Sequence, residues 1–205
     1  SQPAPDSWSF ARRGEILRAE QEASRAAAEE AASRPPKEPA RPVANVADVG
    51  SGGVVVREAA RWPRFLGQRP NYLWGMIASA FVYHPRTVTL LIDGAPPETR
   101  RIRNVIIANG KYFGKGFKAA PDARLDDGLL DVVSLGDYST LMSIWHLPKL
   151  RAGTHIHLDK VKHYRAAKLE IRSDEEVFLE LDGELVGLLP ASFGIIPGAL
   201  EVITG

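Results

Sequence analysis

Short apolar runs separated by turn residues dominate the chain after residue 43. A run of four to eight residues that alternates apolar with polar, or that is apolar throughout, predicts a β-strand. On this criterion we expect strands at residues 45–53, 87–93, 102–108, 129–135, 168–172, 177–181 and 200–203. Strands outnumber helices and turn signals recur at short intervals. The pattern therefore predicts a mainly β fold, an antiparallel two-layer β-sandwich with one or two short helices, rather than a β-α-β array.

Two segments follow helical rules instead. Asn71 is a suitable N-cap for a helix over 72–84, which must stop before Pro85. A shorter helix is expected at 141–150. Because the first helix is apolar on nearly every side, we expect its large aromatic residues in the core, namely Trp74, Phe81 and Tyr83. Their alternative role is to form the wall of a site for a lipid chain.

The beginning of the chain differs in composition from the rest. Residues 1–45 hold 11 Ala and six of the 15 Pro, with seven basic and seven acidic side chains. Such a segment buries too little apolar surface to offset the entropy lost on ordering. We therefore interpret residues 1–42 as a polar tail and linker, with a solvated helix at 11–33, and residues 43–205 as the folded domain.

Composition narrows the classes of function. With 205 residues, 44% of them hydrophobic, the chain holds one ordinary domain. The formal net charge of +1 gives no electrostatic reason to expect nucleic acid, and the lack of cysteine excludes disulfides, thiolate metal sites and a cysteine nucleophile. The longest nearly apolar stretch, 72–83, is shorter than the roughly 20 residues of a membrane-spanning helix, and residues 1–30 carry no signal-peptide pattern. We expect a soluble or peripheral protein of the cytoplasm.

A glycine-rich segment, NGKYFGKG at 109–116, follows the strand expected at 102–108. Glycine permits positive φ and a close approach of the backbone to another group. The segment is not a Walker loop, because no Lys-Ser/Thr pair closes it, and no helix clearly starts after it as a dinucleotide fingerprint requires. On its residues alone, it is a wide turn.

Acidic residues beside turns form two further candidate sites. The segment APDARLDDGL at 120–129 has two adjacent carboxylates that could bind a hard cation together with backbone carbonyls, although a solvated turn is the simpler interpretation.

In LELDGEL at 179–185, Glu184 emerges just after the hairpin signal Asp182-Gly183. A glutamate there could act as a general base if a substrate hydroxyl came within about 3 Å; an exposed turn residue is the alternative. Alternation places Val177, Leu179 and Leu181 on one strand face and Phe178, Glu180 and Asp182 on the other.

The histidines are weaker candidates. If their segment is a strand, His155 and His157 share one face, which would suit a metal ion. No third ligand stands at a suitable spacing, so a solvated pair is the simpler interpretation. Neither a Gly-x-Ser-x-Gly elbow nor an HExxH helix occurs in the sequence.

Taken in order, these segments resemble one known family. The motifs are NVADVGSGG (45–53), YHPRTVTLLIDG (83–94), NGKYFGKGFKAAPDARLDDGLLDVV (109–133), LELDGEL (179–185) and LPASFGIIPGALEVI (189–203). Their types and their order are similar to those of the C-terminal domain of the diacylglycerol kinase catalytic family, in particular the YegS-like bacterial lipid kinases. The resemblance covers residues 43–205.

The resemblance implies a reaction and two sites. Such enzymes transfer the γ-phosphoryl group of ATP to a lipid hydroxyl, which gives phosphatidate when the lipid is diacylglycerol. By resemblance, Glu184 is the general base, and Asp127 binds Mg²⁺ together with the backbone carbonyls of Arg124 and Leu129. ATP is then the co-substrate, and the lipid and the membrane surface are the partners. A second copy of the chain, in a homodimer, is a further candidate partner.

The sequence departs from the family pattern in two places. The Gly-Gly-Asp-Gly-Thr of the nucleotide-binding domain does not occur in it, and residues 1–42 are too short to replace a domain of about 100–150 residues. We therefore interpret the chain as the C-terminal half of a lipid kinase, with ATP bound mainly elsewhere. A non-catalytic lipid-binding or regulatory module is the alternative. Lys115 also interrupts a glycine run that is often all glycine in the family.

Overall fold

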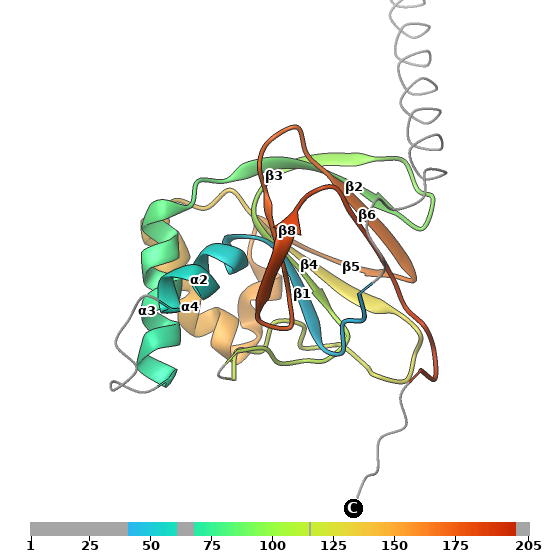
Figure 1. Ribbon diagram of the computed structural model, residues 1–205, viewed down its shortest axis with the longest axis horizontal. Helices are drawn as coiled ribbons and strands as arrows, with labels where there is room; N and C mark the ends of the chain where they lie inside the picture. Colours follow the sequence, from blue (N-terminus) through green and yellow to red (C-terminus); the bar gives the residue numbers. More distant parts are fainter. Residues whose placement is uncertain (1–40, 61–67, 115, 200–205) are drawn as a thin grey trace, which may run out of the picture.

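The computed structural model describes residues 41–60, 68–114 and 116–199 (Figure 1). Within these residues the strands are β1 (Val46–Gly50), β2 (Arg86–Ile92), β3 (Glu98–Ala108), β4 (Leu130–Gly136), β5 (Val161–Ala166), β6 (Lys168–Arg172), β7 (Phe178–Leu181), β8 (Glu184–Leu188) and β9 (Ala191–Gly194). The helices are α2 (Ser51–Ala60), α3 (Gln68–Val82), α4 (Thr140–Ala152) and the 3₁₀ helix η2 (Thr154–His157). The expected helix at 11–33, the strand at 200–203 and Lys115 lie outside the described residues, as does most of the expected linker.

All nine strands belong to one antiparallel sheet that divides at β3, its longest strand. The first half of β3 pairs with β2, from which the sheet continues to β6 and β9. The second half lies between β1 and β4, which lead to β7 and β8 on one side and to β5 on the other. The sheet curls so that its two parts enclose a core (Figure 1). The prediction of a mainly β, antiparallel sandwich-like fold is confirmed, and both layers belong to a single sheet.

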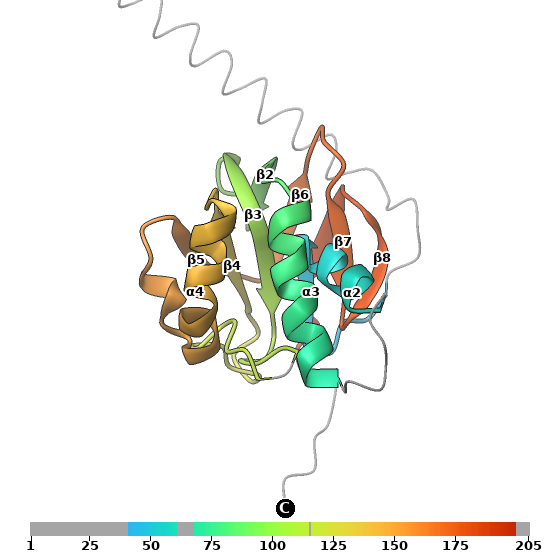
Figure 2. The ribbon, with the colours of Figure 1, turned by 90° about the vertical axis from the view of Figure 1, so that its left-hand side faces the viewer.

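Two apolar clusters lie on opposite faces of this sheet. The core inside the curl is built from the inward residues of several strands, among them Val49, Leu90, Ile102, Val105, Leu169 and Ile171. The three helices gather on the outer side, as Figure 2 shows. There a second cluster joins the outer residues of β3 and β4, such as Ile106 and Val133, to Leu150 of α4. The polar side chains considered below lie on this helix-covered side.

A β-bulge in β3 changes which residues face the helices. The register with β4 shifts between Ile102 and Asn104, so that an extra residue enters the strand. Arg103 then donates hydrogen bonds to the carbonyls of Tyr83 at 2.9 Å and Tyr138 at 3.0 Å, while its neighbour Asn104 reaches β1. The bulge therefore brings two polar side chains to the helical side from one strand.

The strand expected at 45–53 is wrong in its last three residues, because β1 ends at Gly50 and α2 begins at Ser51. The small residues that suggested the end of a strand are needed for close packing. A Cβ atom on Gly53 would lie 2.7 Å from Cδ1 of Leu185 and 2.9 Å from Cβ of Phe178. Glycine at this position lets α2 lie directly against β7 and β8.

The other helices agree with the sequence in part. The helix expected at 141–150 is confirmed as α4, with Ser139 as its N-cap and Gly153 in the left-handed region after it. The helix expected at 72–84 is confirmed as α3, but it begins at Gln68, so the prediction that Asn71 is its N-cap is wrong. Among the aromatic residues expected in the core, Tyr83 is buried, whereas Trp74 and Phe81 are 42% and 65% exposed. No helix in the described ranges has the length and apolar character needed to cross a bilayer.

Candidate functional site

The Asp-Gly-Glu turn joins β7 to β8. Asp182 and Gly183 have positive φ values of 45° and 95°, as a tight two-residue hairpin turn requires. The Asp182 carboxylate accepts hydrogen bonds from the backbone N–H groups of residues 44–46 at distances between 2.8 and 3.1 Å. This side chain therefore anchors the start of β1. Glu184, the first residue of β8, is exposed and accessible to a ligand.

A cavity of about 540 Å³ lies on the helical side of the sheet, next to this turn. Its size is within the range of small-molecule sites. Apolar side chains from the sheet, α2, α3 and α4 form most of its wall, among them Val46, Val55, Met76, Ile106, Leu147 and Leu150. Asp182 and Gly183 border the cavity, and Asp48, Asn104 and Glu180 add a polar group to its wall.

Two of these polar residues are carboxyl groups on adjacent strands. Asp48 of β1 and Glu180 of β7 are opposite each other in the strand register, and both are buried. Asp48 accepts hydrogen bonds from the N–H of Gly52 and the side-chain amide of Asn104, and Glu180 accepts one from the N–H of Gly183. Burial, followed by repulsion from Glu180, raises the pKa of Asp48 to about 8, and burial also raises the pKa of Glu180.

The sequence alone does not reveal this pair. Alternation predicts only that Glu180 lies on the strand face opposite Leu179, and Asp48 stands in the middle of a segment predicted to be an apolar strand. One signal was available: a carboxylate in the middle of an otherwise apolar strand must have a partner or an altered pKa. Its partner, however, is more than 130 residues away in the chain, so the pairing could not be derived locally.

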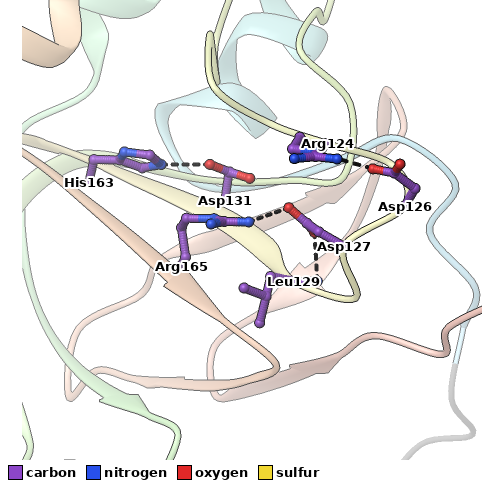
Figure 3. Close-up of polar contacts among 7 residues, drawn as sticks. All are labelled: Arg124, Asp126, Asp127, Leu129, Asp131, His163 and Arg165. Carbon is purple, nitrogen blue, oxygen red and sulfur yellow. Dashed lines mark hydrogen bonds and ion pairs between the residues drawn. The ribbon is translucent and has the colours of Figure 1, made fainter.

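The acidic residues just before and within β4 make four polar contacts (Figure 3). Asp127 forms an ion pair with Arg165 of β5, and its other carboxylate oxygen accepts the N–H of Leu129 at 3.0 Å. Its neighbour Asp126 pairs with Arg124 at 3.3 Å in an exposed position. Further along β4, the buried Asp131 contacts Nε2 of His163 at 2.7 Å.

The Mg²⁺ site that the resemblance implied, Asp127 with the backbone carbonyls of Arg124 and Leu129, stays a prediction, and the ion would compete with these contacts. Mg²⁺ prefers six oxygen ligands in octahedral geometry, usually including waters. Both oxygens of Asp127 already have partners, and the guanidinium of Arg165 supplies a positive charge beside them.

The glycine-rich loop has a structural explanation. Phe113 and Phe117 exchange backbone hydrogen bonds of 3.0 and 3.1 Å, which close the loop into a small hairpin. The side-chain amide of Asn45 donates to the carbonyl of Tyr112 at 3.0 Å and so ties this loop to β1. The interpretation of this segment as a turn agrees with these contacts.

His155 and His157 do not lie on a strand, because the structure places both in the 3₁₀ helix η2. His155 is buried, and its Nε2 lies 3.0 Å from the carbonyl oxygen of Ala119. Burial lowers the pKa of His155 to about 4, so this ring is neutral at physiological pH. His157 is exposed. The two side chains do not share a face.

Similar proteins were found among curated sequences and solved structures. The chain is 27% identical over 143 residues to a diacylglycerol kinase of Mycobacterium tuberculosis (strain CDC 1551 / Oshkosh), covering 70% of this chain and 45% of the relative. It is 32% identical over 160 residues to a Shewanella frigidimarina protein named "Probable lipid kinase YegS-like", covering 78% and 51%. The chain thus spans about half the length of these relatives.

The structural comparison supports the fold. The crystal structure of a diacylglycerol kinase from Bacillus anthracis str. Sterne matches with a TM-score of 0.50 and 19% identity over 77% of this chain and 52% of that chain. A second structure from the same organism reaches a TM-score of 0.55 with 21% identity, over 75% and 50%. A family model described as "YegS C-terminal NAD kinase beta sandwich-like domain" matches residues 45–204. The chain therefore belongs to the family of YegS C-terminal, NAD kinase-like β-sandwich domains.

Proposed function

We propose that this chain is the lipid-substrate half of an ATP-dependent lipid kinase, with diacylglycerol as the default substrate and phosphatidate as the product. Family membership and relatives named as diacylglycerol or lipid kinases support the class of reaction. The observation that carries the proposal is the apolar cavity bordered by the turn that positions Glu184. An acyl chain suits the apolar wall, and a lipid hydroxyl would lie near the turn.

In this mechanism the Glu184 carboxylate takes the proton of the lipid hydroxyl. The hydroxyl oxygen forms a bond to the γ-phosphorus, while the bond between that phosphorus and the β–γ bridging oxygen breaks and ADP leaves. A carboxylate promotes this step only when the phosphoryl group is already held in line with the hydroxyl. We propose that ATP, as its Mg²⁺ complex, is held mainly by residues outside this chain. The lack of Gly-Gly-Asp-Gly-Thr and the half-length match to the relatives support that division.

The exposed side of α4 supports a peripheral position at a membrane surface. Leu141 and Trp145 are 76% and 72% exposed and lie one turn apart on this helix. Lys149 and Arg151 follow in the last turn, and the helix sequence contains no acidic residue. Exposed apolar side chains beside basic ones are typical of a helix that lies on an anionic bilayer. Phe81 of the adjacent α3 is also exposed.

A non-catalytic lipid-binding module is the second candidate, because the cavity does not depend on a nucleotide. The two functions differ in what Glu184 does: a kinase needs it as a base, whereas a binding module does not.

The test compares Glu184→Gln with the parent in the longer protein that carries both this chain and a nucleotide-binding domain, using ATP and diacylglycerol in mixed micelles. Because glutamine cannot accept the proton, turnover should fall about 10²–10⁴-fold. Unfolding free energy should change by less than about 0.5 kcal/mol, as for other exposed positions. Glu176→Gln, an equal charge change at an exposed loop residue, is the control and should keep full turnover. If Glu184→Gln keeps more than about a third of the turnover, Glu184 is not the base.

A further inference from the structure

The Asp-Gly-Glu turn is fixed to the start of β1 by both the side chain and the backbone of Asp182. Oδ1 of Asp182 accepts the N–H groups of Asn45 at 3.1 Å and Val46 at 2.9 Å. Its Oδ2 accepts the N–H of Ala44 at 2.8 Å, and its backbone N–H donates to the carbonyl of Val46 at 2.9 Å. Hydrogen bonds to a carboxylate are stronger than those between neutral groups. The position of the turn is therefore set by residues 44–46 as well as by the pairing of β7.

The same short segment also holds the glycine-rich loop. The carbonyl of Asn45 accepts the N–H groups of Asn109 at 2.8 Å and Gly110 at 3.4 Å, and its side-chain amide donates to the carbonyl of Tyr112 at 3.0 Å. The side-chain amide of Asn109 donates to the carbonyl of Ala44 at 3.2 Å. A Cβ atom on Gly110 would overlap with Oδ1 of Asn45, so the loop approaches this closely only with glycine there. The segment is thus bonded to the turn and to the loop at the same time.

The hairpin between β2 and β3 has the same kind of anchor away from this site. Asp93 has a φ of 46°, against 45° for Asp182, and each is followed by a glycine with positive φ. The Asp93 carboxylate accepts the N–H groups of Ala167 at 3.1 Å and Lys168 at 2.7 Å, at the start of β6. In the sheet, β6 is separated from β1 by β2 and β3. The two aspartates therefore have the same structural role in different places, and a comparison of them separates an effect on stability from an effect on catalysis.

Glu184 depends on the turn for its position, because it follows Gly183 directly and begins β8, which pairs with β7 alone among the described strands. We propose that Asp182 and Asn45 are positioning residues for Glu184. Asp182 holds the turn on residues 44–46, and Asn45 holds the glycine-rich loop on the same segment. The carboxylate of Glu184 and the loop then keep one relative position during phosphoryl transfer, a step in which a displacement of about 1 Å can cost about 10²-fold in rate. This role rests on the proposed function, in which Glu184 is the base.

The experiment measures kcat and the KM for diacylglycerol in mixed micelles, with the longer protein that carries both this chain and a nucleotide-binding domain. Asp182→Ala and Asp93→Ala remove the same kind of anchor and introduce the same backbone strain, since the two residues have nearly equal φ values. Both variants should therefore melt at similarly lowered temperatures. Asp182→Ala should lower kcat at least about tenfold and change KM by less than about twofold, whereas Asp93→Ala should keep the kcat of the parent.

Asn45→Ala tests the link to the loop separately. It removes the side-chain bond to Tyr112 and leaves the backbone hydrogen bonds of the turn in place, so it remains informative if Asp182→Ala does not fold. It should lower kcat about threefold or more. The double variant N45A/D182A should lose no more than about twofold beyond Asp182→Ala, because both residues act through one segment.

Three results would overturn the positioning role: an unchanged kcat in Asp182→Ala or in Asn45→Ala, an equal loss of kcat in Asp93→Ala, or losses that multiply in the double variant. Glu184→Gln is measured in the same assay. If it lowers turnover while Asp182→Ala does not, the positioning role is wrong and the proposed base stands. If Glu184→Gln keeps the turnover of the parent, both are wrong.

Discussion

Asp48→Asn is expected to change how the stability of the protein depends on pH. The pKa of Asp48 is about 8 in the folded chain against 3.8 for an ordinary aspartate. Between these values the folded state keeps a proton that the unfolded state releases, so the contribution of Asp48 to stability decreases as pH rises. That contribution is complete below about pH 4 and is lost as pH passes through about 8.

The size of the effect follows from the one proton that the folded state binds and the unfolded state releases. Each pH unit in this window changes the free energy of unfolding by up to about 1.4 kcal/mol, so the interval from pH 5 to pH 7 covers about 3 kcal/mol. Asparagine does not titrate, and its oxygen can still accept the N–H of Gly52. A rotated Asn104 amide can present its unpartnered Oδ1 to the new NH₂ group. The variant should therefore fold and should gain stability relative to the parent as pH rises.

The assay is urea unfolding of the parent and of Asp48→Asn at pH 5, 6 and 7, followed by circular dichroism. The informative quantity is the difference in unfolding free energy between the two proteins at each pH. His155 titrates in the opposite sense in part of this range, but it is present in both proteins and cancels in the difference. If the difference stays constant within about 0.5 kcal/mol from pH 5 to pH 7, Asp48 is ionised in the folded state and the reasoning is refuted.

Three further outcomes are expected. Millimolar Mg²⁺ should leave the melting temperature of the parent unchanged, because Arg165 already pairs with Asp127, and a Mg²⁺-dependent rise in the parent would contradict this. The variant Arg165→Ala should melt at a lower temperature and regain stability when Mg²⁺ is added. Replacing both Leu141 and Trp145 by serine should weaken binding to vesicles with about 30% phosphatidylglycerol roughly tenfold, measured by co-sedimentation, with little change in melting temperature. Unchanged binding would exclude this face of α4 as the membrane contact. As pH falls from 6.5 towards 4, His155 should cost the parent up to about 1.4 kcal/mol of unfolding free energy per pH unit, and His155→Gln should not show this loss in urea unfolding. Identical pH profiles of the two proteins would show that the ring is already charged in the folded state.

Local patterns were sufficient for several elements. The strand at 87–93 and its Asp93-Gly94 turn appear as β2 and its hairpin to β3, since both turn residues adopt the positive φ that this dipeptide favours. The helix at 141–150 was predicted correctly because its start and end are set by neighbouring residues, Ser139 and Gly153. Three strands were missed, namely β5, β8 and β9, because their sequences mix polar residues or glycine with apolar ones and show no clear alternation.

What the sequence by itself determined is therefore the class of fold, the family and the position of Glu184 just after a tight turn. These depend on periodicity, turn chemistry and motif order, all of which are local. The tertiary structure alone decided that Gly53 belongs to a helix packed on the sheet, that Arg165 forms an ion pair with Asp127, and that Asp48 lies opposite Glu180 beside a cavity. Each of these contacts joins strands or helices that are distant in the chain. Strand register and burial decide which side chains meet and what charge they carry, and neither can be derived from neighbouring residues.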